Sequence, residues 1–349
     1  MEHITRIGMD TSKRIFQLHG VDAKERVVLR RKLLRGDMVR YFERLAPTLI
    51  AIEACGSSHH WARELGKLGH QVRLIAPQHA KRYVKRGKND AADAEALCEA
   101  ASRPTMEYVP AKSADQQAAL MLAGVRDRLV RNRTQLANTI RGMAAEFGLI
   151  AAKGIRHVLP LLDRIAADAT VPVLARELFA SQGEEYAALE ARIAQADAQL
   201  QAWFRSNPMA KKQTSIPGVG AVIASLVVMK TPDPHAFKSG RDFAAWLGLT
   251  PKDHSTAGKV RLGGITRAGD ETLRSLLVVG ATSVISHLRR KPQPGARPWL
   301  EKLLERKAPK LVAIALANKM ARIIWKLLTS EAAYDPTHPS PACRPALAA

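Results

Sequence analysis

The chain has 349 residues, 46% of them apolar, which suffices for about two domains with apolar cores and excludes a disordered chain or a small disulfide-stapled scaffold. Lys and Arg (54) exceed Asp and Glu (32) by 22. This net positive charge favours a polyanionic partner such as nucleic acid. The alternatives are a basic surface that only contacts solvent and a protein that binds an anionic membrane.

The cysteines and the apolar runs exclude several classes of protein. Three cysteines without a Cys-x-x-Cys pair indicate neither a disulfide framework nor a thiolate zinc site. No apolar run approaches the roughly 20 residues that span a bilayer, and the first residues, MEHITRIGMD, are not of signal-peptide type. We therefore expect a cytoplasmic protein with no membrane partner.

The N-terminal part, residues 1–112, predicts an α/β domain. An antiparallel meander is followed by strands that alternate with helices, and this is the order of a ribonuclease H fold. The expected elements are strands at 4–10, 16–22 and 25–33, a helix near 37–46, a strand at 49–55, a helix at 61–69 and a strand at 71–77.

The rest of the chain predicts mainly helices. Residues 113–206 form a helical linker, in which the apolar positions of 186–203 step by three and four and predict a coiled-coil seam. Both an internal helical hairpin and a dimerising coiled coil fit this seam. Residues 207–330 form a third domain whose helices are interrupted by Gly and Pro rather than by strands, and the proline-rich residues 331–349 form a disordered tail.

Four carboxylates are the candidate catalytic and metal-binding residues. Asp10 ends the first strand and Glu53 lies near the end of a neighbouring strand, while Asp90 and Asp93 share one face of a helix start. Clustered carboxylates repel one another unless a cation lies between them, and their oxygens suit Mg²⁺ or Mn²⁺. Each acid alone could instead be a turn residue, an ion-pair partner or a helix cap.

Two further segments are candidate nucleic-acid contacts. The run 81–88 could be a solvated charged loop, but beside a phosphate-cleaving site we favour a role in holding a nucleic-acid backbone. Its basic residues are Lys81, Arg82, Lys85, Arg86 and Lys88. The turn Ile216–Gly220 leads into an apolar helix, as in a helix-hairpin-helix element, where Gly218 and Gly220 could present backbone amides to a phosphate.

A polar, glycine-rich loop between two helical stretches of 243–277 carries Ser255 and Thr256. A serine there could attack phosphorus, with Lys259, Arg261 or Arg267 neutralising the phosphate. From the residues alone, a turn or helix cap is the commoner role of such a pair.

Several motifs in order resemble the IS110 and IS1111 insertion-sequence transposases from about residue 4 to 330. They are IGMDTSK, IEACGSSHHW, KNDAADAEAL, SIPGVGAVIASLVV and GLTPKDHSTAGKVRLGGITRAGDETLR. The resemblance implies a RuvC-like domain with an Asp-Glu-Asp-Asp set, matched by Asp10, Glu53, Asp90 and Asp93, and a transposase domain with a nucleophilic serine. Alignment up to RAGDETLR puts Ser255 at that position, whereas alignment on GLTP puts Thr256 there; we assign Ser255.

The resemblance also implies partners. Family members cut and rejoin donor and target DNA, are guided in characterised cases by a structured noncoding RNA, and act as homo-oligomers. We therefore expect DNA and a guide RNA as partners and a location at the nucleoid of a prokaryotic cell. A Mg²⁺-dependent junction nuclease that uses water as nucleophile is the first alternative, and a non-catalytic nucleic-acid-binding protein is the second.

Overall fold

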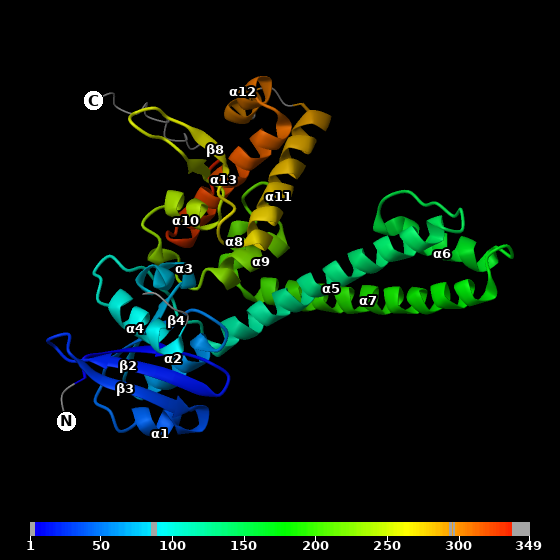
Figure 1. The fold of residues 1–349 in the computed structure, drawn as a ribbon. Helices are drawn as coiled ribbons and strands as arrows, with labels where there is room; N and C mark the ends of the chain where they lie inside the picture. The colour runs from blue at the N-terminus through cyan, green and yellow to red at the C-terminus, as the bar shows by residue number, and fades with distance from the viewer. Residues whose placement is uncertain (1–3, 85–88, 293–294, 296, 337–349) are drawn as a thin grey trace. The chain divides into compact units, whose positions relative to one another are not determined.

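The chain divides into two compact units, Met1–Ala118 and Ala119–Ala349 (Figure 1). The computed structural model describes residues 4–84, 89–292, 295 and 297–336. A mixed α/β sheet domain in the N-terminal unit and a helical C-terminal unit confirm the predicted fold class at this level. Of the predicted features, Lys85, Arg86 and Lys88 and the tail from residue 337 lie outside the described residues.

A sheet in the order β3-β2-β1-β4-β5-β6 forms the N-terminal unit. Strand β1 pairs antiparallel with β2 and parallel with β4, and β2–β3 and β4–β5 continue the antiparallel and parallel halves. The predicted meander and the parallel strands are therefore confirmed. The strands are β1 (Arg6–Asp10), β2 (Ile15–Val21), β3 (Val27–Leu34), β4 (Leu49–Glu53), β5 (Gln71–Ile75) and β6 (Tyr108–Val109).

One face of this sheet packs on α1 and α2. Because side chains alternate along a strand, Ile7 and Met9 of β1 point to this face and are fully buried with Phe42 of α1 and Leu65 of α2. The helices and 3-10 turns of the unit are η1 (Arg35–Asp37), α1 (Met38–Phe42), α2 (Ser58–Lys67), α3 (Pro77–Ala80), η2 (Lys81–Tyr83) and α4 (Asp90–Ala100).

The opposite face packs on α4 and bears smaller residues. Gly8 of β1 and Ala51 of β4 lie on this face, and Ala51 shares a core with Leu97 and Ala100 of α4. The small residues allow the α4 backbone to lie close to the sheet.

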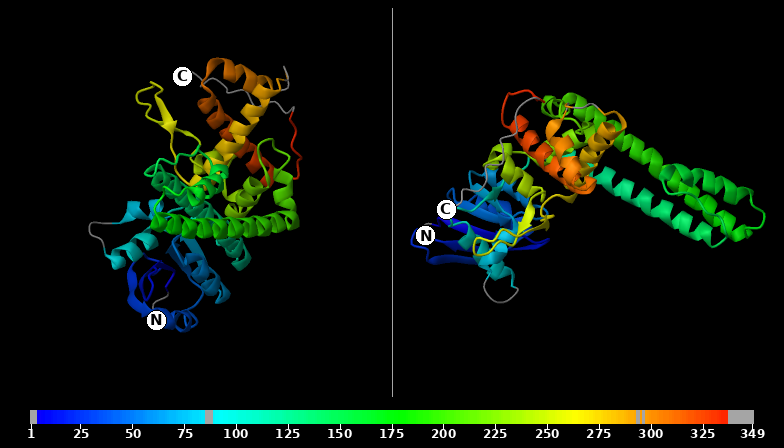
Figure 2. Two further views of the ribbon diagram at one scale, coloured as in Figure 1. Left: turned by 90° about the vertical axis from the view of Figure 1, so that its right-hand side faces the viewer. Right: turned by 90° about the horizontal axis from the view of Figure 1, so that it is seen from above.

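Two long helices, α5 and α7, run side by side in the C-terminal unit, as all the views of Figures 1 and 2 show. The seam residues Leu189 and Ile193 of α7 are buried in one cluster with Leu129 of α5, and Arg133 pairs with Glu190 at 2.8 Å. This burial within one chain favours the internal hairpin over a dimer seam. The elements are α5 (Ala114–Ala145), which begins in the N-terminal unit, η3 (Ile155–His157), α6 (Val158–Ala167) and α7 (Val173–Ser206).

The remaining helices of this unit enclose a second apolar core, in which Phe243, Leu277 and Ala317 are fully buried. A two-stranded hairpin, β7–β8, interrupts the helices, so the expectation that only Gly and Pro interrupt them is wrong. These exposed strands have no apolar alternation to reveal them. The elements are α8 (Pro208–Gln213), α9 (Ala221–Lys230), η4 (Pro234–Ala236), α10 (Gly240–Trp246), β7 (Pro251–Asp253), β8 (Leu262–Ile265), α11 (Glu271–Arg290), α12 (Pro298–Arg306) and α13 (Pro309–Leu328).

Candidate active site

Asp10 and Glu53 end two neighbouring parallel strands. The register pairs Met9 with Ile52, so that Asp10 and Glu53 come next on their strands and point to the same face of the sheet. That face is the one covered by α4. Among the described residues Glu53 has no ion-pair partner, so a structural salt bridge does not account for it.

The other two acids lie in the first turn of α4, which Asn89 caps. The Asn89 side chain accepts the backbone N–H of Ala91 at 2.9 Å, the usual N-cap bond. Asp90 is therefore not the cap residue, and its carboxylate and that of Asp93 remain available to a ligand.

A glycine sets the distance between α4 and the sheet. A Cβ atom on Gly8 would lie 2.0 Å from the Ala94 carbonyl oxygen and 2.5 Å from the Cys98 backbone nitrogen. Any side chain at this position would therefore push α4 away from β1. Sequence reasoning missed Gly8 because nothing local in IGMDTSK reveals which helix crosses the strand.

Three of the acids act electrostatically on the fourth, Asp10. Burial, followed by the negative charges of Asp90, Asp93 and Glu53, raises the pKa of Asp10 from 3.8 to about 6. The Thr11 backbone N–H, which donates to the Asp10 carboxylate, opposes this shift only in part. We refer to these four residues, Asp10, Glu53, Asp90 and Asp93, as the carboxylate cluster.

The carboxylate cluster is an open arrangement. In the described ranges, no group of three or more His, Cys, Asp or Glu side chains is placed so that it could hold a metal ion. The chemistry of the cluster nevertheless fits a divalent cation, because its donors are all carboxylate oxygens and their charges already penalise ionisation of Asp10.

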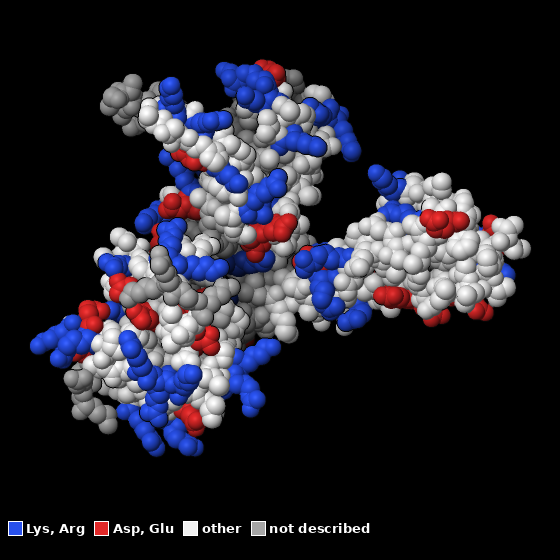
Figure 3. Space-filling view, viewed as in Figure 1, with Lys and Arg blue, Asp and Glu red and all other residues white. Residues whose placement is uncertain are grey.

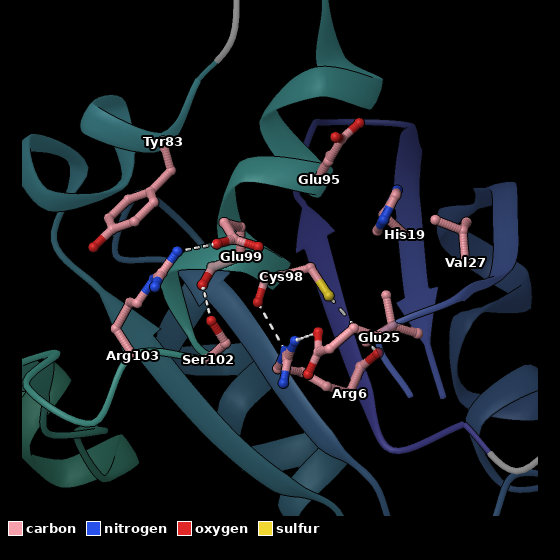
Figure 4. Close-up of a pocket in the computed structure, with 11 residues that line it drawn as sticks. Arg6, His19, Glu25, Val27, Tyr83, Glu95, Cys98, Glu99, Ser102 and Arg103 are labelled. Carbon is pink, nitrogen blue, oxygen red and sulfur yellow. Dashed lines mark hydrogen bonds and ion pairs between the residues drawn. The ribbon is translucent and has the colours of Figure 1, made fainter. Parts of the chain in front are cut away.

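A separate pocket of about 680 Å³ lies along the C-terminal half of α4 (Figure 4). Arg6 donates to Glu25 and to the Cys98 carbonyl, and Arg103 pairs with Glu99. Because both arginines have acidic partners, the pocket offers no surplus positive charge to a phosphate. None of the cluster residues lines it.

Ser255 lies on the exposed β7–β8 hairpin. The chain reverses through Ala257 and Gly258, both at positive φ, between the bridged residues Thr256 and Lys259. The Ser255 hydroxyl accepts the Arg261 backbone N–H at 3.0 Å. Hydrogen bonds from the Ser255 side chain and backbone lower the pKa of Asp253.

The base of this hairpin is tightly packed. A Cβ on Gly248 would lie 2.2 Å from the Ala268 carbonyl oxygen, and one on Gly269 would lie 1.7 Å from that of Trp246. The buried Arg274 of α11 donates to the carbonyl oxygens of Leu247 and Ala268, at 3.1 and 2.8 Å. Sequence reasoning missed Arg274, because an arginine buried in a helix cannot be told from an exposed one by spacing alone.

The remaining predicted contacts are in different environments. Lys81 and Arg82 are exposed on η2, and Lys259, Arg261 and Arg267 are exposed on or beside the hairpin. Gly220 is the exposed N-cap of α9, with open space around it. Gly218 instead packs on α11, where an added Cβ would lie 2.7 Å from the Gly280 carbonyl oxygen. Its position is explained by packing.

The sequence of the chain is similar to those of known transposases. The transposase IS116/IS110/IS902 family model matches residues 210–297, and an IS110 DEDD transposase model matches residues 7–147. The chain is 65% identical over 334 residues to "Putative transposase y4pF/y4sB" of Sinorhizobium fredii, over 96% of this chain and 86% of the relative. It is 49% identical to "Probable family 20 transposase" of Pseudomonas aeruginosa, over 96% and 99% of the two chains. It is 38% identical to "Transposase for insertion sequence element IS1111A" of Coxiella burnetii, over 96% and 92%.

Proposed function

Because the chain belongs to the IS116/IS110/IS902 family of insertion-sequence transposases, enzymes that cut and rejoin DNA, we propose that it recombines DNA with the carboxylate cluster and Ser255. The observation that carries the proposal is the placement of the four acids: Asp10 and Glu53 end paired parallel strands on the face covered by α4, and Asp90 and Asp93 lie in the first turn of that helix. The order of the N-terminal sheet supports a ribonuclease H-like, RuvC-like assignment of that domain. The domain limits at 112, 206 and 330, the coiled-coil linker and the helix-hairpin-helix element belong to the same proposal.

The carboxylate cluster has the role of holding divalent cations beside the phosphate that is cut. Asp10 and Glu53 are fixed at the ends of paired strands, and Asp90 and Asp93 at the start of α4, so each carboxylate approaches from a rigid element. Mg²⁺ or Mn²⁺, when bound there, supplies positive charge to the phosphate under attack. Its charge also offsets the repulsion within the cluster.

Ser255 is the nucleophile in this proposal. Its Oγ forms a bond to phosphorus and loses the hydroxyl proton to solvent, the bond from phosphorus to the deoxyribose oxygen breaks, and the departing oxygen takes up a proton from solvent. The resulting phosphoester conserves the bond energy for rejoining. In that step a DNA hydroxyl attacks phosphorus and loses its proton, the bond from phosphorus to the Ser255 Oγ breaks, and the Oγ regains a proton. Lys259 and Arg261 are exposed on the same hairpin and can neutralise the phosphate.

The charge of the chain supports nucleic-acid partners. Lys and Arg side chains occur over both units on the face in Figure 3, and the net charge is +22. Donor DNA, target DNA and a guide RNA together carry more phosphate charge to be neutralised than one duplex does. We therefore include RNA among the partners. We also propose a homo-oligomer and a location at the nucleoid. In the described residues, none of the helices is long and apolar enough to span a membrane.

The test is a search for a covalent protein–DNA adduct. The chain is purified from cells that carry the whole element, the RNA that co-purifies is sequenced, and the complex is incubated with Mg²⁺ and donor and target duplexes. We expect a discrete RNA and an adduct that Ser255→Ala removes and its neighbour variant Thr256→Ala retains. Cleaved ends without any adduct would instead establish a nuclease that uses water, and loss of the adduct only in Thr256→Ala would move the nucleophile to Thr256.

A further inference from the structure

Strand β3 bears two exposed cations, Arg30 and Lys32, on the face of the sheet that carries Asp10. Along one row of the sheet, Asp10 pairs with Gln17 of β2, and Gln17 pairs with Lys32 of β3. Cross-strand partners point to the same face of a sheet, so Lys32 lies on the face that carries Asp10. Arg30, two residues away on β3, shares this face.

The distances suit one continuous nucleic-acid strand. Neighbouring strands are spaced by about 4.8 Å, so the Lys32 backbone lies about 10 Å from that of Asp10, across β2. Arg30 lies about 7 Å further along the edge strand, since each residue advances the strand by about 3.4 Å. Helix α4 packs on β1 and β2, whereas Arg30 and Lys32 are exposed on β3.

Neither of these two side chains is held by a charged or aromatic partner among the described residues. In the described part of the chain, neither Arg30 nor Lys32 makes an ion pair or a cation–π contact. Arg31, between them, points to the other face, where its guanidinium lies 5.0 Å from the centre of the Tyr41 ring. Lys and Arg side chains crowd the part of the surface where Figure 1 places β2 and β3 (Figure 3).

We propose that the DNA strand cut at the carboxylate cluster continues across Gln17 onto β3, where Arg30 and Lys32 bind its backbone phosphates. The occupant is DNA rather than RNA, because the row of the sheet that carries Lys32 also carries Asp10. This contact binds the phosphate backbone and does not select a base sequence, because the two side chains reach no base edge in this arrangement. This inference rests on the proposed function of the carboxylate cluster.

The test compares two double variants of the full-length chain. Arg30→Gln/Lys32→Gln removes the proposed contacts, and Arg31→Gln/Arg40→Gln removes two charges from the same strand and from α1 on the other face. The probe is a fluorescent single-stranded oligonucleotide with the sequence of the element end, titrated without divalent metal from 50 to 300 mM salt. Each phosphate contact contributes about 0.7 to the slope of log K against log salt for single strands.

We expect the slope to fall by about 1.4 in Arg30→Gln/Lys32→Gln and to stay at the wild-type value in Arg31→Gln/Arg40→Gln. The exchange variant Arg30→Lys/Lys32→Arg keeps both charges and should keep the slope, which separates charge from folding. An unchanged slope in the first variant, or an equal fall in the control, would overturn the inference.

Two further readouts separate the possible failures. Loss of co-purified RNA from Arg30→Gln/Lys32→Gln with unchanged DNA binding would assign this face to RNA and overturn the inference. Neutral methylphosphonate linkages beside the cut phosphate should weaken binding by the wild type and not by this variant. If wild-type chain cuts DNA while both double variants bind it equally, the inference fails and the proposed function stands; if Asp10→Asn cuts DNA at the wild-type rate, the proposed function fails.

Discussion

Gly8 of β1 lies directly beneath Ala94 of α4, so close that a Cβ atom on the glycine would lie 2.0 Å from the Ala94 carbonyl oxygen. This contact fixes the height of α4 above the sheet, and α4 carries two of the four acids in its first turn. The geometry of the carboxylate cluster therefore depends on a residue that has no side chain.

The Gly8 contact predicts that Gly8→Ala separates α4 from β1. We expect a loss of about 1–3 kcal/mol in the free energy of unfolding, as for other overpacked sites, together with loss of DNA cutting. The control is Gly66→Ala in α2, where an added Cβ meets nothing within 4 Å and should be neutral or stabilise the helix by up to about 1 kcal/mol. Denaturant unfolding and a cleavage assay measure both effects, and full activity in Gly8→Ala would contradict this account.

The raised pKa of Asp10 predicts a pH-dependent stability of the metal-free chain. Its folded-state pKa of about 6 lies above the ordinary 3.8, so the stability that the protonated form provides is complete below about pH 4 and is lost as the pH rises through about 6. Asp10→Asn cannot ionise. We therefore expect its Tm in EDTA to exceed the wild-type Tm above pH 6 and to converge with it toward pH 4.

Mg²⁺ should reduce this difference in Tm at neutral pH. At ten times its Kd, the ion should stabilise the wild type by about 1.4 kcal/mol and should stabilise Asp10→Asn less. Thermal melts with and without Mg²⁺ measure the effect, with Asp37→Asn on the exposed η1 turn as the control. Tm curves for wild type and Asp10→Asn that stay parallel across pH would contradict the raised pKa of Asp10. Equal Tm shifts of the two proteins on adding Mg²⁺ would contradict a role of Asp10 in holding the ion.

The two hydrogen bonds that Arg274 donates should stabilise the base of the β7–β8 hairpin. Arg274→Met leaves the Leu247 and Ala268 carbonyls without their donor and should cost about 1–3 kcal/mol of unfolding free energy. Arg290→Met, at the exposed end of the same helix, should change it by less than about 0.5 kcal/mol. Equal effects of the two variants in denaturant unfolding would mean that the Arg274 bonds add nothing to the fold.

The packing of α7 on α5 predicts a stability effect that is independent of concentration. Ile193→Ala empties part of the cluster with Leu129 and should cost about 2–4 kcal/mol. If the seam is internal, this cost is the same at about 1 μM protein and at about 50 μM protein. A cost that shrinks at high concentration would instead place the seam between two copies.

The sheet and most of the cluster were predictable because they depend on local patterns. Alternating apolar residues reveal the strands, and Asp10 and Glu53 follow from where β1 and β4 end. The β7–β8 hairpin was not predictable, since its strands are exposed and lack alternation. The roles of Gly8, Arg274 and Lys32 depend on contacts between distant segments, which spacing along the chain does not reveal.

The most direct test of the central claim is Mg²⁺-dependent DNA cutting by Asp93→Asn, measured beside Glu99→Gln. Both acids lie on α4, but Glu99 pairs with Arg103 at the far end of the helix and is not part of the carboxylate cluster. We predict at least about a 100-fold loss of cutting rate in Asp93→Asn, because a ligand matters no less than its outer-shell partners, and wild-type activity in Glu99→Gln. Wild-type cutting by Asp93→Asn would contradict the assignment of the active site.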